Sequence, residues 1–242
     1  MAKAFVIPDI HLKPCIFEEA EKKISAGEYE RIVLLGDLVD EWGQERNIAL
    51  YNETFDAVIA FVRAHPNTLY CYGNHDVSYR FERLESGFSA YAIDTVVERL
   101  ADLEDALPDG AAAFIHRVNN VLFSHAGLVT SFIAQHFPLA QDIALDEIID
   151  RINKMGVDEL WADNSPIWVR PNDVLYYGNK LYPSGMRQVV GHTPMPKAKE
   201  YEELLMVDTF STYQDSTPIG DQLFTWVDTI TGDWGVVTDT VC

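Results

Sequence analysis

Five short polar clusters carry most of the residues in this sequence whose side chains could perform chemistry. Each contains an aspartate, a histidine or both, and each follows a run of apolar residues that predicts a strand. Carboxylate, imidazole and amide groups without thiolates are the ligands of a dinuclear centre of divalent ions. A single cluster of this kind is usually an ordinary polar strand end, whereas five in order favour a metal site. The clusters are Asp9-Ile10-His11, Gly36-Asp37-Leu38-Val39-Asp40, Gly73-Asn74-His75-Asp76, Ser124-His125-Ala126-Gly127 and Gly191-His192-Thr193-Pro194.

Strands alternate with helices over the first third of the chain, and these elements must position the clusters. Strands are expected at 4–8, 31–35 and 68–72, and helices at 16–25 and 46–65. This alternation predicts an α/β fold. Because ligands bind at the carboxyl ends of strands in such sheets, the clusters are expected to meet there although they lie far apart in the sequence.

The remainder of the chain shows weaker patterns. Between 77 and 110 one helix, at 95–105, is predicted, so this stretch is a candidate insertion or lid over a site. Residues 163–185 are rich in proline, asparagine, glycine and tyrosine, and long irregular segments of this kind tend to be functional. Further strands are predicted at 113–118, 120–124, 188–190, 204–207, 223–227 and 235–237, and a helix at 143–155.

Composition restricts the class of protein. The chain has 242 residues, of which 48% are hydrophobic and 23% charged, and a single globular domain over 1–242 is expected. Its 38 acidic and 18 basic residues give a formal charge of −20, which disfavours nucleic acids and anionic membranes as partners. Cys15, Cys71 and Cys242 form no CxxC motif, and no apolar run reaches the length of a membrane span or signal peptide. A cytoplasmic protein is therefore expected.

The five motifs DxH, GDxxD, GNHD, SHAG and GHTP, in this order, resemble those of the calcineurin-like metallophosphoesterases. Together they span residues 9–194. The single histidine of the GHT tripeptide at 191–193 and the WVR tripeptide at 168–170 are most similar to the phosphoprotein phosphatase branch and its bacterial relatives. The resemblance implies a four-layer αββα sandwich of two mixed sheets, and a hydrolase that cleaves phosphoesters at a dinuclear metal centre.

The resemblance also implies a role for each motif residue. Asp37 would bridge two divalent ions, with a hydroxide between them as the nucleophile. His75 would donate a proton to the leaving group while Asp40 orients its imidazole, and Arg170, Asn74 and His75 would contact the substrate. Manganese or iron is favoured, and zinc or cobalt is possible. The expected ligands are Asp9, His11 and Asp37 for the first ion, and Asp37, Asn74, His125 and His192 for the second.

One position departs from the family pattern and leaves several functions open. Phosphoprotein phosphatases usually have a phosphate-binding arginine after GDxxD, whereas this chain has Glu41. A negative charge there disfavours a phosphomonoester dianion, so a phosphodiesterase and a dinucleoside polyphosphate hydrolase stand beside the favoured phosphatase. The substrate would be a phosphorylated small molecule, a nucleotide or a phosphoprotein. A non-catalytic metal-binding scaffold is the alternative of another class, and no oligomeric state is predicted.

Two further positions near the motifs are interpreted as mainly structural. Asp208 follows a predicted strand and is taken as a turn anchor, with support of His192 as the lesser alternative. Tyr79 follows GNHD closely, and its ring could equally line the substrate pocket or fill the core.

Overall fold

Apolar side chains on both faces of its strands stabilise the first sheet of the fold. The computed structural model describes residues 2–238. Neighbouring residues of a strand point to opposite faces, so Phe5 and Ile7 pack against helices while Val6 packs towards the other sheet. The strand order is β11 (Trp234–Val236), β10 (Thr225–Asp228), β1 (Lys3–Ile7), β2 (Arg31–Leu34), β3 (Thr68–Cys71) and β4 (Ala112–Ala113).

The second sheet packs face to face with the first. Val121, Val189 and Leu205 from this sheet join Val6 and Val33 from the first in one buried cluster between the two. Within each sheet the central strands are parallel and the outer pairs include antiparallel neighbours, so both sheets are mixed. Its strand order is β5 (Ile115–Val118), β6 (Val121–Ser124), β7 (Arg187–Val190), β9 (Leu204–Met206) and β8 (Lys199–Tyr201).

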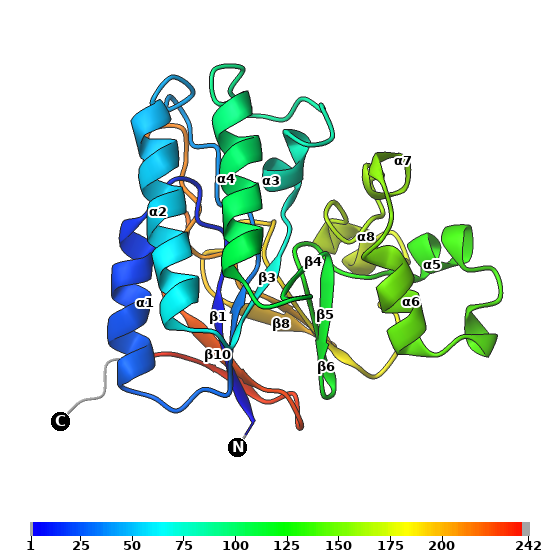
Figure 1. Cartoon of the computed structure of the whole chain (residues 1–242). Coiled ribbons are helices and arrows are strands. Elements are labelled where there is room, and N and C mark those ends of the chain that lie inside the picture. Colours follow the sequence, from blue (N-terminus) through cyan, green and yellow to red (C-terminus); the bar gives the residue numbers. More distant parts are fainter. Residues whose placement is uncertain (1, 239–242) are drawn as a thin grey trace.

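Helices cover the outer face of each sheet and complete a four-layer αββα sandwich (Figure 1). On the first sheet these are α1 (Cys15–Ser25), α2 (Ile48–Ala64) and α4 (Ile93–Ala106). On the second they are α5 (Thr130–His136), α6 (Leu145–Ile152), α7 (Val157–Leu160) and α8 (Pro171–Leu175). Two short elements, α3 (Asn74–Ser78) and a 3-10 helix (Ala140–Asp142), lie in the connections. This architecture confirms the predicted fold class.

The predicted strand at 113–118 is wrong in its extent. It is divided between β4 and β5, which lie in different sheets, because the chain crosses from one sheet to the other at Phe114. The side chain of Asn153 accepts hydrogen bonds from the backbone N–H groups of Phe114 (3.0 Å) and Ile115 (2.9 Å) at this crossing. Helix α5 and strand β8 have no counterpart among the predicted elements, since such short segments show no clear periodicity.

The two segments interpreted as candidate functional regions differ in structure. Within 77–110, α4 packs against α2 and buries Val96 and Leu100 in the core, whereas the turn at 85–87 borders the pocket described below. Residues 163–185 are irregular apart from α8 and a β-bridge at Leu181, as the sequence predicts.

The structure adds two findings on membrane spans and cysteines. Among residues 2–238, no helix combines the length and the apolar character that crossing a membrane requires. Cys15 and Cys71 are free thiols, and Cys242 lies outside the described residues.

Candidate metal centre

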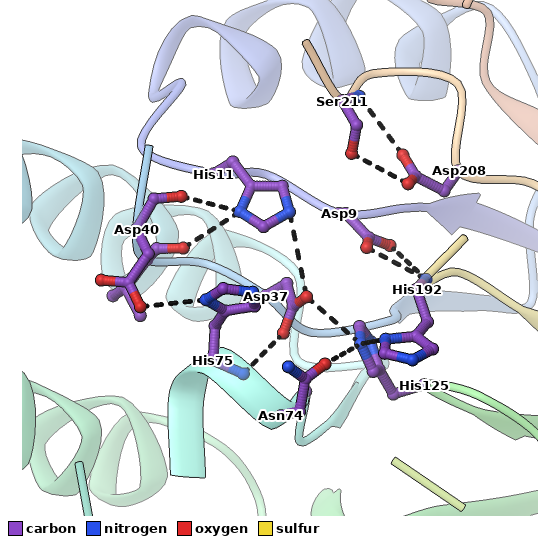
Figure 2. A network of polar contacts seen from close by, with 12 residues as sticks. Asp9, His11, Asp37, Asp40, Asn74, His75, His125, His192, Asp208 and Ser211 are labelled. Carbon is purple, nitrogen blue, oxygen red and sulfur yellow. Dashed lines mark hydrogen bonds and ion pairs between the residues drawn. The ribbon is translucent and has the colours of Figure 1, made fainter. Parts of the chain in front are cut away.

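The carboxyl ends of the parallel strands bring all five sequence clusters to one edge of the two sheets (Figure 2). The first sheet contributes the residues after β1, β2 and β3, and the second those after β6 and β7. The backbone N–H of His192 thereby donates to both carboxylate oxygens of Asp9, at 3.1 and 3.0 Å, although 183 positions separate them. The predicted site residues that meet at this edge are Asp9, His11, Asp37, Asp40, Asn74, His75, His125 and His192.

His125 is the centre of one group of potential metal ligands. Its Nε2 atom lies 3.2 Å from Asp37 Oδ2, 3.0 Å from Asn74 Oδ1 and 3.0 Å from His192 Nδ1. Asp37, His125 and His192 can place one ligand atom each within 4.8 Å of one another, and all three are buried. The four residues predicted for the second ion therefore surround one point.

Asp9, His11 and Asp37 form the other group, again with ligand atoms within 4.8 Å of one another. His11 Nε2 lies 3.8 Å from Asp37 Oδ2, the oxygen that also faces His125. Asp37 thus belongs to both groups, which is the position that a bridging carboxylate requires.

The imidazoles of His11 and His192 present nitrogen lone pairs to this centre. Burial lowers the pKa of His11 and, more strongly, of His192, which keeps both rings neutral. In both of these rings the other nitrogen faces a backbone carbonyl oxygen and so carries the proton, and His125 makes a similar carbonyl contact. Lone pairs that face carboxylate oxygens repel one another unless a cation lies between them, so this donor set fits divalent ions. The carbonyl contacts are His11 Nδ1 to Asp40 (2.8 Å), His125 Nδ1 to Leu35 (2.7 Å) and His192 Nε2 to Trp168 (3.1 Å).

Crowded carboxylates also fit a cationic centre. Burial raises the pKa of Asp9 well above its ordinary value, and the nearby Asp208 and Asp37 raise it further. Burial would raise the pKa of Asp37 as well, but His125 and His75 outweigh this effect and lower that pKa well below its usual range. Buried carboxylates that perturb one another in this way are typical of metal sites.

Backbone strain is concentrated at the same residues. His11, Asp37, Asp40 and His192 have φ angles of 45°, 49°, 66° and 63°, in the left-handed region that residues other than glycine rarely adopt. Each such residue costs on the order of 1–2 kcal/mol, and clusters of them are found mainly at functional sites.

Two glycines leave room for the carboxylates. A Cβ atom on Gly73 would overlap Oδ1 of Asp37, and one on Gly191 would overlap Oδ1 of Asp9. The motif positions after β3 and β7 are therefore glycine because an aspartate occupies the space of a side chain. It follows the neighbouring strand β2 in the first case and β1 of the other sheet in the second.

His75 and Asp40 form a pair beside the two ligand groups. His75 Nδ1 donates to Asp40 Oδ2 at 3.0 Å, and the backbone N–H of His75 donates to Asp37 Oδ1 at 3.0 Å. Burial would lower the pKa of His75, but Asp37 and Asp40 outweigh this and raise it to about 9. A protonated imidazole at neutral pH can act as a proton donor.

A pocket of about 320 Å³ opens over the site, and Arg170 lies on its wall together with His75 and His192. Arg170 Nη1 donates to the carbonyl oxygen of His192 at 2.6 Å and to Thr193 Oγ1 at 3.2 Å. Within residues 2–238 no carboxylate forms an ion pair with Arg170, so its positive charge can act on a ligand in the pocket.

Glu41, the departure from the family pattern, also lines the pocket, but its charge is balanced. Lys13 Nζ donates to Glu41 Oε2 at 2.5 Å, and Thr212 Oγ1 donates to Glu41 as well, at 3.1 and 3.0 Å to the two oxygens. The expectation of an added negative charge at Glu41 is therefore corrected: the glutamate and lysine form a neutral pair. Lys13 is two residues beyond His11, and this proximity is the only signal of its role in the sequence.

Asp76, the last residue of GNHD, supports the candidate centre through backbone contacts that the sequence alone does not reveal. Its carboxylate accepts hydrogen bonds from the backbone N–H groups of Asp37 (2.8 Å), Leu38 (2.8 Å) and Gly73 (3.0 Å), and so joins the turns after β2 and β3. Asp208 accepts from the hydroxyl of Ser211 at 2.8 Å, in agreement with the interpretation as a turn anchor.

Comparisons with known proteins agree with this geometry. Residues 2–214 match the family model described as calcineurin-like phosphoesterase. No curated protein sequence matches the chain.

Several solved structures share the fold. A cold-active protein tyrosine phosphatase has a TM-score of 0.55 at 15% identity, over 98% of this chain and 78% of that chain. A protein serine/threonine phosphatase from Saccharomyces cerevisiae, with similarity to human phosphatase PP5, has a TM-score of 0.54 at 17% identity, over 94% and 73%. A metallophosphoesterase from Sphaerobacter thermophilus has a TM-score of 0.51 at 16% identity, over 98% and 88%.

Proposed function

The chain belongs to the calcineurin-like phosphoesterase family, whose members hydrolyse phosphoesters with divalent metal ions, and from that premise we propose that it is a phosphatase acting on phosphomonoesters. One observation carries the proposal: two groups of metal-ligand side chains, the His75–Asp40 pair and Arg170 surround a single pocket. The same combination of a proton donor with a phosphate-binding cation argues against a scaffold without catalysis.

The donor set would hold two divalent ions. Manganese or iron is proposed first, and zinc or cobalt suits such mixed ligands as well. When bound, the ions would lower the pKa of water in the site and offset the negative charge of the phosphate. The proposed ligands are Asp9, His11 and Asp37 for one ion, and Asp37, Asn74, His125 and His192 for the other.

Three side chains of the chain would act on the substrate directly or through a neighbour. Arg170 would bind non-bridging phosphate oxygens through its planar set of N–H donors. His75 would donate its proton to the departing oxygen, and Asp40 would hold the ring so that Nε2 faces the pocket.

A substrate panel tests this proposal. We expect the purified chain, supplied with manganese or iron, to hydrolyse phenyl phosphate faster than its diester counterpart, diphenyl phosphate. Arg170→Ala should raise the KM for the monoester by about tenfold or more, because a charge-assisted contact to phosphate is lost. If only the diester were hydrolysed, the phosphatase proposal would fail while the family assignment would stand.

A second candidate function, hydrolysis of a nucleotide diester or a dinucleoside polyphosphate, has its own support. Trp42 and Tyr213 both line the pocket with partly exposed rings, and an exposed aromatic ring can stack on a base. Glu85 brings a further carboxylate to the same pocket, which disfavours a dianion relative to a monoanion. Turnover of a dinucleoside tetraphosphate or a cyclic nucleotide in excess of phenyl phosphate would favour this candidate.

A further inference from the structure

We propose that Tyr51 and Tyr79 are positioning residues that hold Asp40, and through it His75, in the geometry for proton donation. The inference rests on the proposed function, because it concerns the same pocket and the same proton donor. Neither tyrosine lines the pocket, so each would act through Asp40.

Both phenols donate to the same oxygen of Asp40. Tyr51 Oη lies 3.0 Å and Tyr79 Oη 2.5 Å from Asp40 Oδ1, while the other oxygen, Oδ2, accepts from His75 Nδ1 at 3.0 Å. A carboxylate held by two donors on one oxygen cannot rotate without breaking both hydrogen bonds. The oxygen that faces His75 is therefore fixed in place, and the imidazole with it.

The two tyrosines are themselves anchored in the core. Tyr51, in α2, is 0% exposed and Tyr79, just after α3, is 2% exposed. The backbone N–H of Ser89 donates to Tyr79 Oη at 2.9 Å, so the phenol accepts there and its own proton is directed to Asp40. The ring of Tyr79 stacks on Phe88 with centroids 4.4 Å apart and planes at 22°.

The hydrogen bonds from the two tyrosines matter because Asp40 contacts both His11 and His75. The carbonyl oxygen of Asp40 contacts His11 Nδ1 at 2.8 Å, while its side chain holds His75. Asp40 also has a left-handed backbone, with φ 66°, which requires support from its surroundings. The tyrosines thus stabilise a residue that touches both a proposed metal ligand and the proposed proton donor. They also give the segment after α3 a role in the site, since Tyr79, Phe88 and Ser89 all belong to it.

Leaving-group dependence separates positioning from a merely structural role. A p-nitrophenolate leaves without a proton, whereas an alkoxide leaves only when it is protonated, so a misplaced His75 slows the second reaction alone. We expect Tyr79→Phe and Tyr51→Phe each to lower kcat for an alkyl phosphate about tenfold. For p-nitrophenyl phosphate, kcat should fall less than about twofold in each variant, and KM should be unchanged for both substrates. Tyr72→Phe is the matched control, because its hydroxyl donates to the carboxylate of Glu104 away from the pocket.

A second measurement needs no substrate. The proton of His75 Nδ1–H, observed by NMR in protein loaded with diamagnetic zinc, should shift or broaden in Tyr51→Phe and Tyr79→Phe and stay in place in Tyr72→Phe. Thermal unfolding would show that the variants are folded. Equal losses on both substrates, or an unmoved His75 resonance, would overturn the positioning role. If the unmodified chain hydrolysed neither substrate, the proposed function would fail, and the resonance would still decide on the tyrosines.

Discussion

Lys13 shows how one side chain changes the charge of the pocket. Glu41 replaces the arginine that the family pattern places there, and the sequence therefore suggests a site that repels phosphate dianions. The ion pair with Lys13 offsets this charge, and both side chains are largely shielded from solvent, at 20% and 13% exposed. An ion pair that is partly buried is screened less by water than one on the surface.

Removing Lys13 should therefore weaken substrate binding. We expect Lys13→Met to raise the KM for a phosphomonoester about threefold to tenfold, because the carboxylate of Glu41 is left without its counter-charge beside the pocket. The double variant Lys13→Met with Glu41→Gln should recover most of the loss. Steady-state kinetics at fixed ionic strength would measure both, and an unchanged KM in the single variant would contradict the charge argument.

His75 is the side chain on which turnover is expected to depend most. His75→Asn keeps a polar side chain but removes the proton donor, so kcat for an alkyl phosphate should fall about 100-fold to 1,000-fold. Metal content, measured by elemental analysis, should remain as in the unmodified chain, since His75 is in neither group of candidate ligands. Full turnover by this variant would remove His75 from the mechanism.

Among the strands, β3 and β5 are linked across the sandwich by the imidazole of His116. His116 of β5 places its Nε2 atom 3.0 Å from the carbonyl oxygen of Tyr70 in β3, although these strands belong to different sheets. The side chain is buried, and burial lowers its pKa from the ordinary value of 6.5. The neutral ring is thus the form that the fold accommodates.

This burial predicts a pH dependence of stability. As pH falls below about 6.5, the unfolded chain takes up a proton at His116 before the folded chain does, so the free energy of unfolding decreases. Above that pH the effect vanishes because the ring is neutral in both states. We expect His116→Gln to reduce the loss of stability between pH 7 and pH 5. Denaturant unfolding of metal-loaded protein at several pH values would measure it, and parallel curves for the two proteins would contradict the prediction.

Both sheets contribute proposed ligands to one candidate centre, so metal binding should stabilise the chain as a unit. Asp9 and Asp37 follow strands of the first sheet, and His125 and His192 follow strands of the second. Saturation with manganese, at about 100 times its Kd, should raise the Tm by roughly 5–10 °C, because the ions bind the folded state alone. A metal titration followed by thermal unfolding, with EDTA-treated protein as the reference, would show it. His192→Ala should reduce the shift, and identical Tm values with and without metal would contradict a site shared by the sheets.

Local signals in the chain account for the fold class and for the residues of the candidate centre. Apolar strands followed by polar clusters such as Asp9-Ile10-His11 are encoded in neighbouring residues, and parallel strand ends then bring the clusters together. Contacts between residues far apart in the sequence are not encoded in neighbouring residues in this way. The pairing of Lys13 with Glu41 joins residues 28 positions apart. The two phenols on Asp40 and the crossing between sheets at Phe114 likewise depend on which side chains the packed layers place next to each other. No periodicity or motif specifies these contacts, because they form only when helices and sheets have packed.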